Sequence, residues 1–144
     1  MDATPWILLS IVILALLALI FGGLAAKFRR NAGQLGQELI LGGEPAILGP
    51  ETAHFSPGQG FGIVKTTGTL ALTESRLIFR KPFGGEIILP LAEVARLEET
   101  TTFRGNWKGG RKFLVVKLRD GREAAFIARD NTRWLSELRA RTEG

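Results

Sequence analysis

The sequence predicts a mainly β domain of seven short strands, closed by one C-terminal helix and preceded by a single membrane-spanning helix. Three observations carry this prediction. Residues 6–26 form an apolar stretch without a charge, residues 45–129 contain strand-like segments separated by Gly, Pro and Asp turns, and residues 131–141 have apolar residues at helical spacing. The chain therefore combines a membrane anchor with one small domain over residues 44–144.

The apolar stretch at residues 6–26 is long enough to cross a bilayer. About 20 apolar residues at 1.5 Å of rise each span a hydrocarbon core of roughly 30 Å, and helices of soluble domains seldom stay apolar on every side for that length. A cleaved secretory signal peptide is the alternative interpretation. Such peptides have a basic leader and a small-residue cleavage site, whereas here the leader is acidic and residues 24–26 are a poor match to such a site.

The charges beside the apolar stretch predict its orientation. Lys27, Arg29 and Arg30 follow the stretch directly, and Asp2 is the only charged residue before it. Lys and Arg beside a span are retained on the cytoplasmic side of the membrane. We therefore expect a single-pass protein of the inner cell membrane, with residues 1–5 outside and the C-terminal domain in the cytoplasm.

One face of the predicted span carries small residues. Ala18, Gly22 and Ala26 recur at every fourth position and so lie on the same side of a helix. Small residues at this spacing let two helices approach closely within a membrane, which indicates self-association or contact with the span of another protein. The simpler interpretation is that Gly and Ala are common in spans.

Residues 27–43 are predicted to be a juxtamembrane linker. Gly33, Gly36, Gly42 and Gly43 interrupt this segment. Because Gly in a helix interior is less favourable than Ala by about 1 kcal/mol, we expect no continuous helix here. The linker is short, so the domain stays close to the membrane.

The domain after the linker is predicted to be a series of β-strands. Asp120-Gly121 is the strongest turn signal, because this dipeptide suits the positive φ angles of a tight hairpin. In the strand before it, Leu114, Val116 and Leu118 share one face, which predicts one core face and one wetter face. The predicted strands cover residues 45–55, 63–73, 76–81, 86–91, 94–99, 111–119 and 122–129.

The last predicted element is an amphipathic helix. Asp130 or Asn131 can accept hydrogen bonds from the free amides at a helix start, and Trp134, Leu135 and Leu138 then fall on one side. An indole needs a large apolar surface, which the open end of a small barrel or sandwich supplies. We therefore expect this helix to close the β domain.

The composition argues against catalysis. The chain has no Cys, and His54 is its only histidine, so disulfides, thiolate or multi-histidine metal sites and a cysteine nucleophile are excluded. The sequence shows no Ser-His-Asp order and no nucleotide fingerprint. Glu98 and Glu99 are adjacent on a predicted strand, so they point to opposite faces and cannot act as a carboxylate pair. We expect no cofactor and no enzymatic activity.

The excess positive charge lies in the last third of the chain. Residues 27–100 hold eight Lys/Arg and eight Asp/Glu, whereas residues 101–144 hold eleven and five. A Gly-rich loop at residues 101–112 interleaves aromatic residues with cations, which is typical of a peripheral membrane contact. Its candidate contact residues are Phe103, Arg104, Trp107, Lys108, Arg111 and Lys112.

Two interpretations of this loop are open. In one, its aromatics enter the membrane interface while its cations meet phospholipid headgroups or an acidic partner protein. In the other, the loop is a hairpin whose aromatics fold back on the barrel and whose cations are solvated. Stacking of nucleic acid on Trp107 is disfavoured, because a membrane tether supplies no reason for it.

Three segments resemble one family of domains. GTLALTESRLIF at residues 68–79 resembles the G-x-L-x-L-T-x-x-R-L-I-F signature of GRAM and bacterial pleckstrin-homology-like (PH-like) domains. IILPLAEV at residues 87–94 resembles the family's strand that ends in I-P-L-x-E-I, and LRDG at residues 118–121 resembles its final hairpin. The resemblance covers residues 44–141. It implies a seven-stranded, strongly bent antiparallel barrel capped by a C-terminal α-helix.

The resemblance does not extend to the family's usual lipid site. Many pleckstrin-homology relatives bind phosphoinositides through a basic cluster in the loop between the first two strands. The matching loop here, residues 56–65, carries a single cation, Lys65. One cation cannot fork around two or more phosphates, so a phosphoinositide pocket is not expected at this place.

The sequence thus predicts a non-enzymatic, membrane-anchored binding or scaffolding module. In one mechanism, the barrel and the span attach to a larger membrane complex as an accessory subunit. In the other, the loop at residues 101–112 docks on anionic phospholipid headgroups. Because the span already anchors the domain, lipid affinity would add orientation rather than recruitment, which favours the protein partner.

Overall fold

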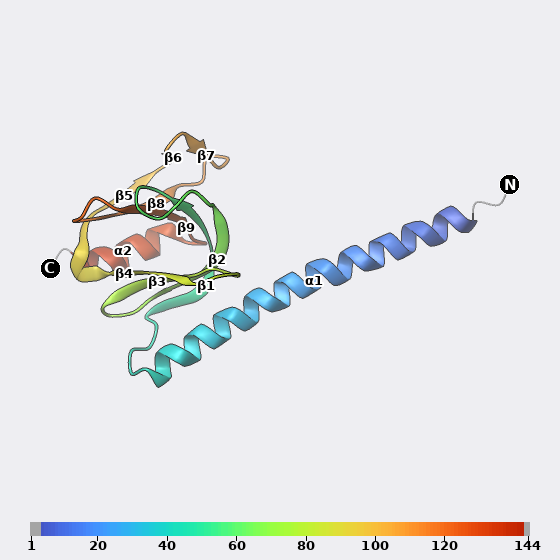
Figure 1. The fold of residues 1–144 in the computed structure, drawn as a ribbon, viewed down its shortest axis with the longest axis horizontal. Coiled ribbons are helices and arrows are strands. Elements are labelled where there is room, and N and C mark those ends of the chain that lie inside the picture. The colour runs from blue at the N-terminus through green and yellow to red at the C-terminus, as the bar shows by residue number, and fades with distance from the viewer. Residues whose placement is uncertain (1–3, 143–144) are drawn as a thin grey trace.

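The computed structural model describes residues 4–142, in which one long helix lies beside a curled β-sheet. The barrel lies beside the C-terminal part of helix α1 (Thr4–Leu41), and the rest of α1 projects beyond it (Figure 1). Residues 1–3 of the predicted external N-terminus, which include Asp2, lie outside the described residues, as do residues 143–144 of the predicted domain.

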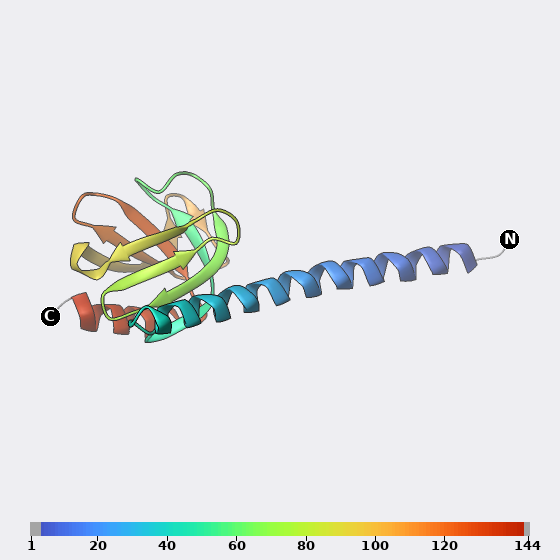
Figure 2. The same cartoon turned by 60° about the horizontal axis from the view of Figure 1, so that its bottom comes forward.

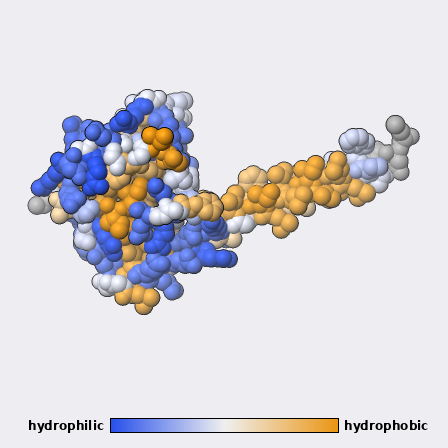
Figure 3. Space-filling view, in the orientation of Figure 1, coloured by the Kyte–Doolittle hydropathy of each residue, from blue (hydrophilic) through white to orange (hydrophobic). Residues whose placement is uncertain are grey.

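Helix α1 is long and apolar enough to cross a membrane. Its projecting part exposes large apolar side chains on all sides, such as Leu19 and Phe21, and forms an apolar rod (Figure 3). A helix that is apolar all round is stable only inside a protein core or a bilayer. Length and composition therefore agree with the predicted span.

Seven strands within residues 4–142 form one antiparallel sheet, in the order β4-β3-β2-β1-β9-β8-β5. The sheet curls around helix α2 (Asn131–Thr142), and a short 3₁₀ turn, η1 (Leu91–Glu93), precedes β5 (Figures 1 and 2). Two further short strands pair with each other as a separate hairpin. The strands are β1 (Leu48–Pro57), β2 (Thr66–Leu72), β3 (Arg76–Arg80), β4 (Glu86–Pro90), β5 (Val94–Thr100), β6 (Thr102–Phe103), β7 (Asn106–Trp107), β8 (Phe113–Leu118) and β9 (Glu123–Ile127).

The predicted barrel is confirmed. Each of the seven predicted strand segments overlaps a strand of the sheet, and the closing helix begins at Asn131. The turn at Asp120-Gly121 joins β8 to β9, with Gly121 at φ +93°. Neighbouring strands follow one another in the chain, apart from the hairpin of β6 and β7 between β5 and β8, except that β1 also pairs with β9 and so joins the two halves of the sheet.

The expectation that glycines would interrupt the helix after residue 26 is wrong. Helix α1 continues through Gly33 and Gly36 to its end. On this segment Leu35 and Leu39 are buried against the outer face of β2 and β3, where they contact Ile78. Burial of a leucine side chain contributes about 1.5–3 kcal/mol, which outweighs a helix penalty of about 1 kcal/mol for each glycine.

A Schellman motif ends α1. Gly43 has φ +79°, and its amide donates to the carbonyl of Ile40 (3.1 Å), while the amide of Glu44 donates to the carbonyl of Leu39 (3.0 Å). The Glu44 carboxylate then accepts hydrogen bonds from the amide (3.1 Å) and the hydroxyl (2.5 Å) of Ser75 in the turn between β2 and β3. These hydrogen bonds lower the pKa of Glu44. The end of α1 is thereby tied to the sheet.

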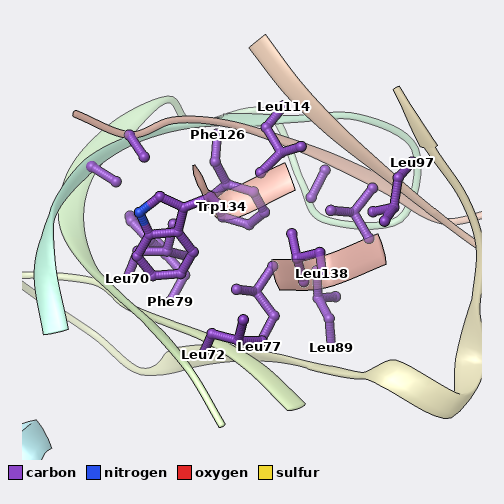
Figure 4. Packing of buried hydrophobic residues seen from close by; sticks show 14 of the residues in the cluster. Leu70, Leu72, Leu77, Phe79, Leu89, Leu97, Leu114, Phe126, Trp134 and Leu138 are labelled. Carbon is purple, nitrogen blue, oxygen red and sulfur yellow. The ribbon is translucent and has the colours of Figure 1, made fainter. Parts of the chain in front are cut away.

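The main core lies between the inner face of the sheet and α2 (Figure 4). The rings of Phe55, Phe79 and Phe126 pack with centroids between 5.1 and 5.7 Å apart. Beside them, Trp134 of α2 is 2% exposed, and its Nε1 donates to Oε1 of Glu51 (2.6 Å). The indole therefore fills the end of the barrel and keeps its polar atom paired.

Replacing Trp134 with Ala is expected to lower the free energy of unfolding by about 3–5 kcal/mol, because the change leaves a cavity in the core. Trp107→Ala is the matched control. The Trp107 side chain is 64% exposed, so we expect a change within about 0.5 kcal/mol. Pulse proteolysis across a urea titration of the full-length protein in mild detergent measures both values. Equal losses for the two variants would contradict this assignment of the core.

Leu35→Ala is expected to detach the end of α1 from the sheet. Leu35 is 1% exposed, and truncating such a leucine costs about 2–5 kcal/mol of packing. Hydrogen–deuterium exchange of the full chain in lipid nanodiscs should show faster exchange at residues 31–41. Ile40→Ala, at a position 64% exposed on the same segment, should leave the exchange unchanged. Unchanged exchange in both variants would show that this packing does not hold the segment.

Candidate functional site

The predicted contact loop is an ordered hairpin over the outer face of the barrel (Figure 1). Strands β6 and β7 pair in antiparallel register. The two-residue turn between them has Arg104 at φ +49° and Gly105 at φ +79°. Positive φ at both central positions defines a tight hairpin turn. The loop therefore has a fixed shape, in which each side chain has a defined side.

Phe103 does not face outward from this hairpin, so the structure favours the interpretation in which this aromatic folds back on the barrel. Its side chain is 6% exposed and packs with residues on the outer face of β8 and β9. Its ring centroid lies 6.0 Å from that of Phe113. Burial against the sheet leaves little of the Phe103 side chain at the surface.

Two of the candidate cations are held in ion pairs on the barrel. Nη1 of Arg104 lies 3.1 Å from Oε1 of Glu123, and Nζ of Lys112 lies 3.1 Å from Oε1 of Glu99. Both cationic side chains are more than half exposed, so each pair contributes little stability. The carboxylates nevertheless balance these charges, which makes the two cations weaker ligands for an outside anion than the sequence indicates.

The remaining candidates, Trp107, Lys108 and Arg111, are exposed. Gly109 and Gly110, with φ +63° and +83°, form a second tight turn, in which the amide of Arg111 donates to the carbonyl of Lys108 (3.1 Å). This turn places the two cations side by side at the base of the hairpin.

These two cations border a groove that the sequence did not predict. Three adjoining hollows of about 240, 270 and 330 Å³ run from α1 across β1 to the hairpin. The first and second share Thr52 and Arg129, and the second and third share His54 and Thr67. We name this feature the cationic groove. The cations that line it are Arg29, Arg129, Arg111, Lys108 and Lys65.

His54 lies in the middle of the cationic groove. Its Nδ1 is 2.7 Å from the hydroxyl oxygen of Thr67 on β2. Burial lowers the pKa of His54, and the positive charges of Arg111 and Lys108 lower it further. The imidazole therefore stays neutral at neutral pH and adds no charge to the groove.

The two walls of the groove are joined at one end. Nζ of Lys65, at the end of the β1–β2 loop, donates a hydrogen bond to Oδ1 of Asn106 on the hairpin. At the other end, beside α1, Glu51 is the one carboxylate among the described residues that line the groove. Its Oε1 already accepts the hydrogen bond from Trp134. The chemistry of the groove is thus that of an anion-binding surface.

A second exposed surface lies near the predicted end of the span. Phe83 and Val64 line one hollow and are 76% and 68% exposed, and the neighbouring Ile63 is 92% exposed. These three residues form what we call the apolar patch. Nζ of Lys27 lies 3.5 Å from the centre of the Phe83 ring, a cation–π contact. Because Lys27 directly follows the apolar stretch, the apolar patch lies at the level where the predicted span ends.

The other predicted residues lie on α1. Ala18, Gly22 and Ala26 are exposed on its projecting part. Of the three cations that predict orientation, Lys27 contacts Phe83, Arg29 lines the cationic groove, and Arg30 is exposed. The structure thus brings one orientation residue into the same groove as two residues of the loop, which the sequence had treated as separate features.

Sequence reasoning did not place His54, Lys65 and Arg129 along one groove. These residues meet because β1 pairs with β2 on one side and with β9 on the other, with His54 opposite both Thr67 and Ile127. The alternation along β1 could have placed His54 on the outer face. No local signal identifies β9 as the second neighbour of β1.

Among residues 4–142, no three His, Cys, Asp or Glu side chains form a group that could hold a metal ion. The groove offers guanidinium, ammonium, imidazole and hydroxyl groups instead. These groups donate hydrogen bonds and positive charge, so the arrangement is suited to non-covalent recognition of an anion.

Comparison with known proteins identifies the fold. No protein-family model and no curated protein sequence matches the chain. The C-terminal domain of an unknown protein from Leishmania infantum is similar, with a TM-score of 0.55 and 14% identity over 78% of this chain and 97% of that one. The N-terminal PH domain of Vps36 is similar with a TM-score of 0.53 and 17% identity, over 71% of this chain and 81% of that one. The barrel that carries the hairpin, the cationic groove and the apolar patch therefore has a PH-like fold.

Proposed function

We propose that this chain is a membrane-anchored, non-enzymatic binding module, which serves as an accessory protein-interaction subunit of a membrane complex on the cytoplasmic face. The PH-like fold supports a binding role in general. Fold alone does not fix function, so the proposal rests on how the barrel is held and on which surfaces it exposes.

The observation that carries the proposal is the continuity of α1. One helix runs from the apolar stretch into contact with the sheet, where Leu35 and Leu39 are buried. A flexible linker would let a domain search the space near the membrane, whereas a packed helix holds it in one orientation. A fixed orientation is useful for a subunit that must fit a neighbour of defined geometry.

Polar contacts reinforce this attachment. Nη2 of Arg80 on β3 lies 2.5 Å from Oε2 of Glu38 on α1 and 3.0 Å from Oε2 of Glu86 on β4. The hydrogen bond from Arg80 lowers the pKa of Glu38. A lowered carboxyl pKa means that the attachment is complete above the ordinary pKa of Glu and weakens as the pH falls through the lowered value.

Two surfaces are suited to a membrane-embedded partner. The apolar patch exposes three large side chains at the level of the span's end, and exposed apolar surface of this kind marks interaction sites. The small-residue face formed by Ala18, Gly22 and Ala26 would let a second helix approach the span closely. Each surface offers a separate place for a partner that has its own span.

Replacing Val64 and Phe83 with Ser is expected to reduce co-purification of a stoichiometric partner about ten-fold or more, because apolar anchors dominate interface energies. The full chain is purified from native membranes in mild detergent. The matched control is Ile40→Ser with Leu41→Ser, at two apolar positions that are 64% and 86% exposed at the far end of α1. Absence of any partner with the unaltered chain, or equal loss in both variants, would contradict the proposal.

Peripheral lipid docking through the hairpin is the second candidate function. The exposed indole of Trp107 beside Lys108 and Arg111 favours it, since an aromatic ring next to cations suits the membrane interface. The burial of Phe103 and the ion pairs of Arg104 and Lys112 leave a smaller contact than the sequence indicates.

Lipid docking by the hairpin predicts that Trp107 reaches the bilayer. The full chain carrying Trp6→Phe is placed in nanodiscs that contain brominated phospholipid, which quenches indoles within the membrane. Trp134 is 2% exposed inside the barrel and serves as the unquenched reference. We expect the brominated lipid to reduce the tryptophan fluorescence of the chain by the part that Trp107 contributes. Trp107→Phe should abolish this quenching. Absence of quenching would exclude this docking mode.

A further inference from the structure

We infer that the cationic groove binds the phosphate-bearing headgroup of an anionic phospholipid from the membrane that holds α1. The inference rests on the proposed membrane anchoring of the chain. It differs from docking by the hairpin, because a headgroup enters a groove between α1, β1 and the base of the hairpin. It also differs from a phosphate site formed by the β1–β2 loop, because that loop contributes only Lys65 and the other four cations of the groove come from other segments.

The position of the groove relative to the span is the first argument. Phe28, Arg29 and Ala32 of α1 form one end of the groove. Arg29 is three residues beyond Ala26, the last residue of the apolar stretch, which corresponds to about 4.5 Å along a helix axis. The headgroup layer on each side of the hydrocarbon core is roughly 5–8 Å thick. The groove therefore begins within the headgroup layer, where a lipid reaches it without leaving the bilayer.

The charge along the groove is the second argument. Each of the three hollows is lined by two cations from different segments: Arg29 and Arg129, then Arg111 and Arg129, then Lys65 and Lys108. Glu51 is the one lining carboxylate in the described part of the chain, and it lines only the hollow beside α1, so the other two hollows are lined by cations without a carboxylate. Such a site attracts an anion and holds it between opposing walls.

The donor geometry is the third argument. Arg111 and Arg129 both line the central hollow, and guanidinium groups match the oxygens of a phosphate with paired donors. Thr52, Thr67 and His54 line the same hollow, and Nδ1 of His54 lies 2.7 Å from the hydroxyl oxygen of Thr67. These donors suit a compact phosphate group. An extended acidic protein segment would have to displace the headgroups that already occupy this level.

His54 provides a direct test, because it is the only histidine in the chain. The full chain, purified without a histidine tag, is labelled at histidine and placed in nanodiscs of phosphatidylcholine alone or of phosphatidylcholine with phosphatidylglycerol. The imidazole is titrated by NMR in both. A bound phosphate offsets the cations that lower the pKa of His54, so we expect that pKa to rise by about 1 pH unit in the anionic nanodiscs.

Matched variants separate binding in the groove from the general potential of an anionic membrane. Arg111→Gln with Arg129→Gln removes two charges from the groove, and the difference in His54 pKa between the two nanodisc types should disappear. Arg119→Gln with Arg133→Gln removes two charges at exposed positions that do not line the groove, and the difference should remain. Urea unfolding checks that all variants stay folded. An equal rise in both variants would overturn the inference.

Three further outcomes are decisive. A rise of the same size produced by soluble glycerol 3-phosphate in phosphatidylcholine nanodiscs would overturn the assignment to a lipid. A response to poly-glutamate without a response to phosphatidylglycerol would overturn it in favour of an acidic protein. Failure of the chain to insert into nanodiscs would refute the proposed anchoring, whereas insertion without any change at His54 would refute the groove site alone.

Discussion

The packing of residues 31–41 of α1 on the outer face of β2 and β3 is the constraint on which the rest of the molecule depends. Leu35 and Leu39 are buried there, and Glu38 and Glu44 add polar ties to the same hairpin of the sheet. Without this contact a flexible linker would connect the barrel to its membrane anchor. With it, every surface of the barrel has a fixed height above the predicted end of the span.

That constraint fixes where the exposed side chains of the barrel lie relative to the predicted span, which would not be so in a free domain. The cation–π contact between Lys27 and Phe83 sets the apolar patch beside the first residue after the apolar stretch. Arg29, two residues further along the same helix, lines the end of the cationic groove. Apolar side chains suit a partner at the bilayer edge, and cations suit the headgroup layer, so the two surfaces match the two environments they would face.

Much of the fold could be predicted from the sequence because it depends on local patterns. Alternating apolar residues identify the strands, Asp120-Gly121 marks the last hairpin, and the spacing of Trp134 and Leu138 identifies the closing helix. The continuous helix could not be predicted, because the penalty of Gly33 and Gly36 is local while the burial that outweighs it comes from the sheet. The hairpin at residues 101–112 shows the same limit. Its composition suggests an outward-facing loop, yet contacts with β8 and β9 turn Phe103 inward.

The sequence alone determined that this chain has one apolar segment able to span a membrane, a small β domain closed by a helix, and an excess of positive charge near its C-terminal end. These properties follow from residue type and spacing along the chain. Only the tertiary structure decided which cations act together. Arg29, Lys65, Arg111 and Arg129 lie far apart in the sequence, and they line one groove because α1 packs beside β1 and because β1 pairs with both β2 and β9. Pairing between distant segments is set by the shape of the whole core, which no local pattern encodes.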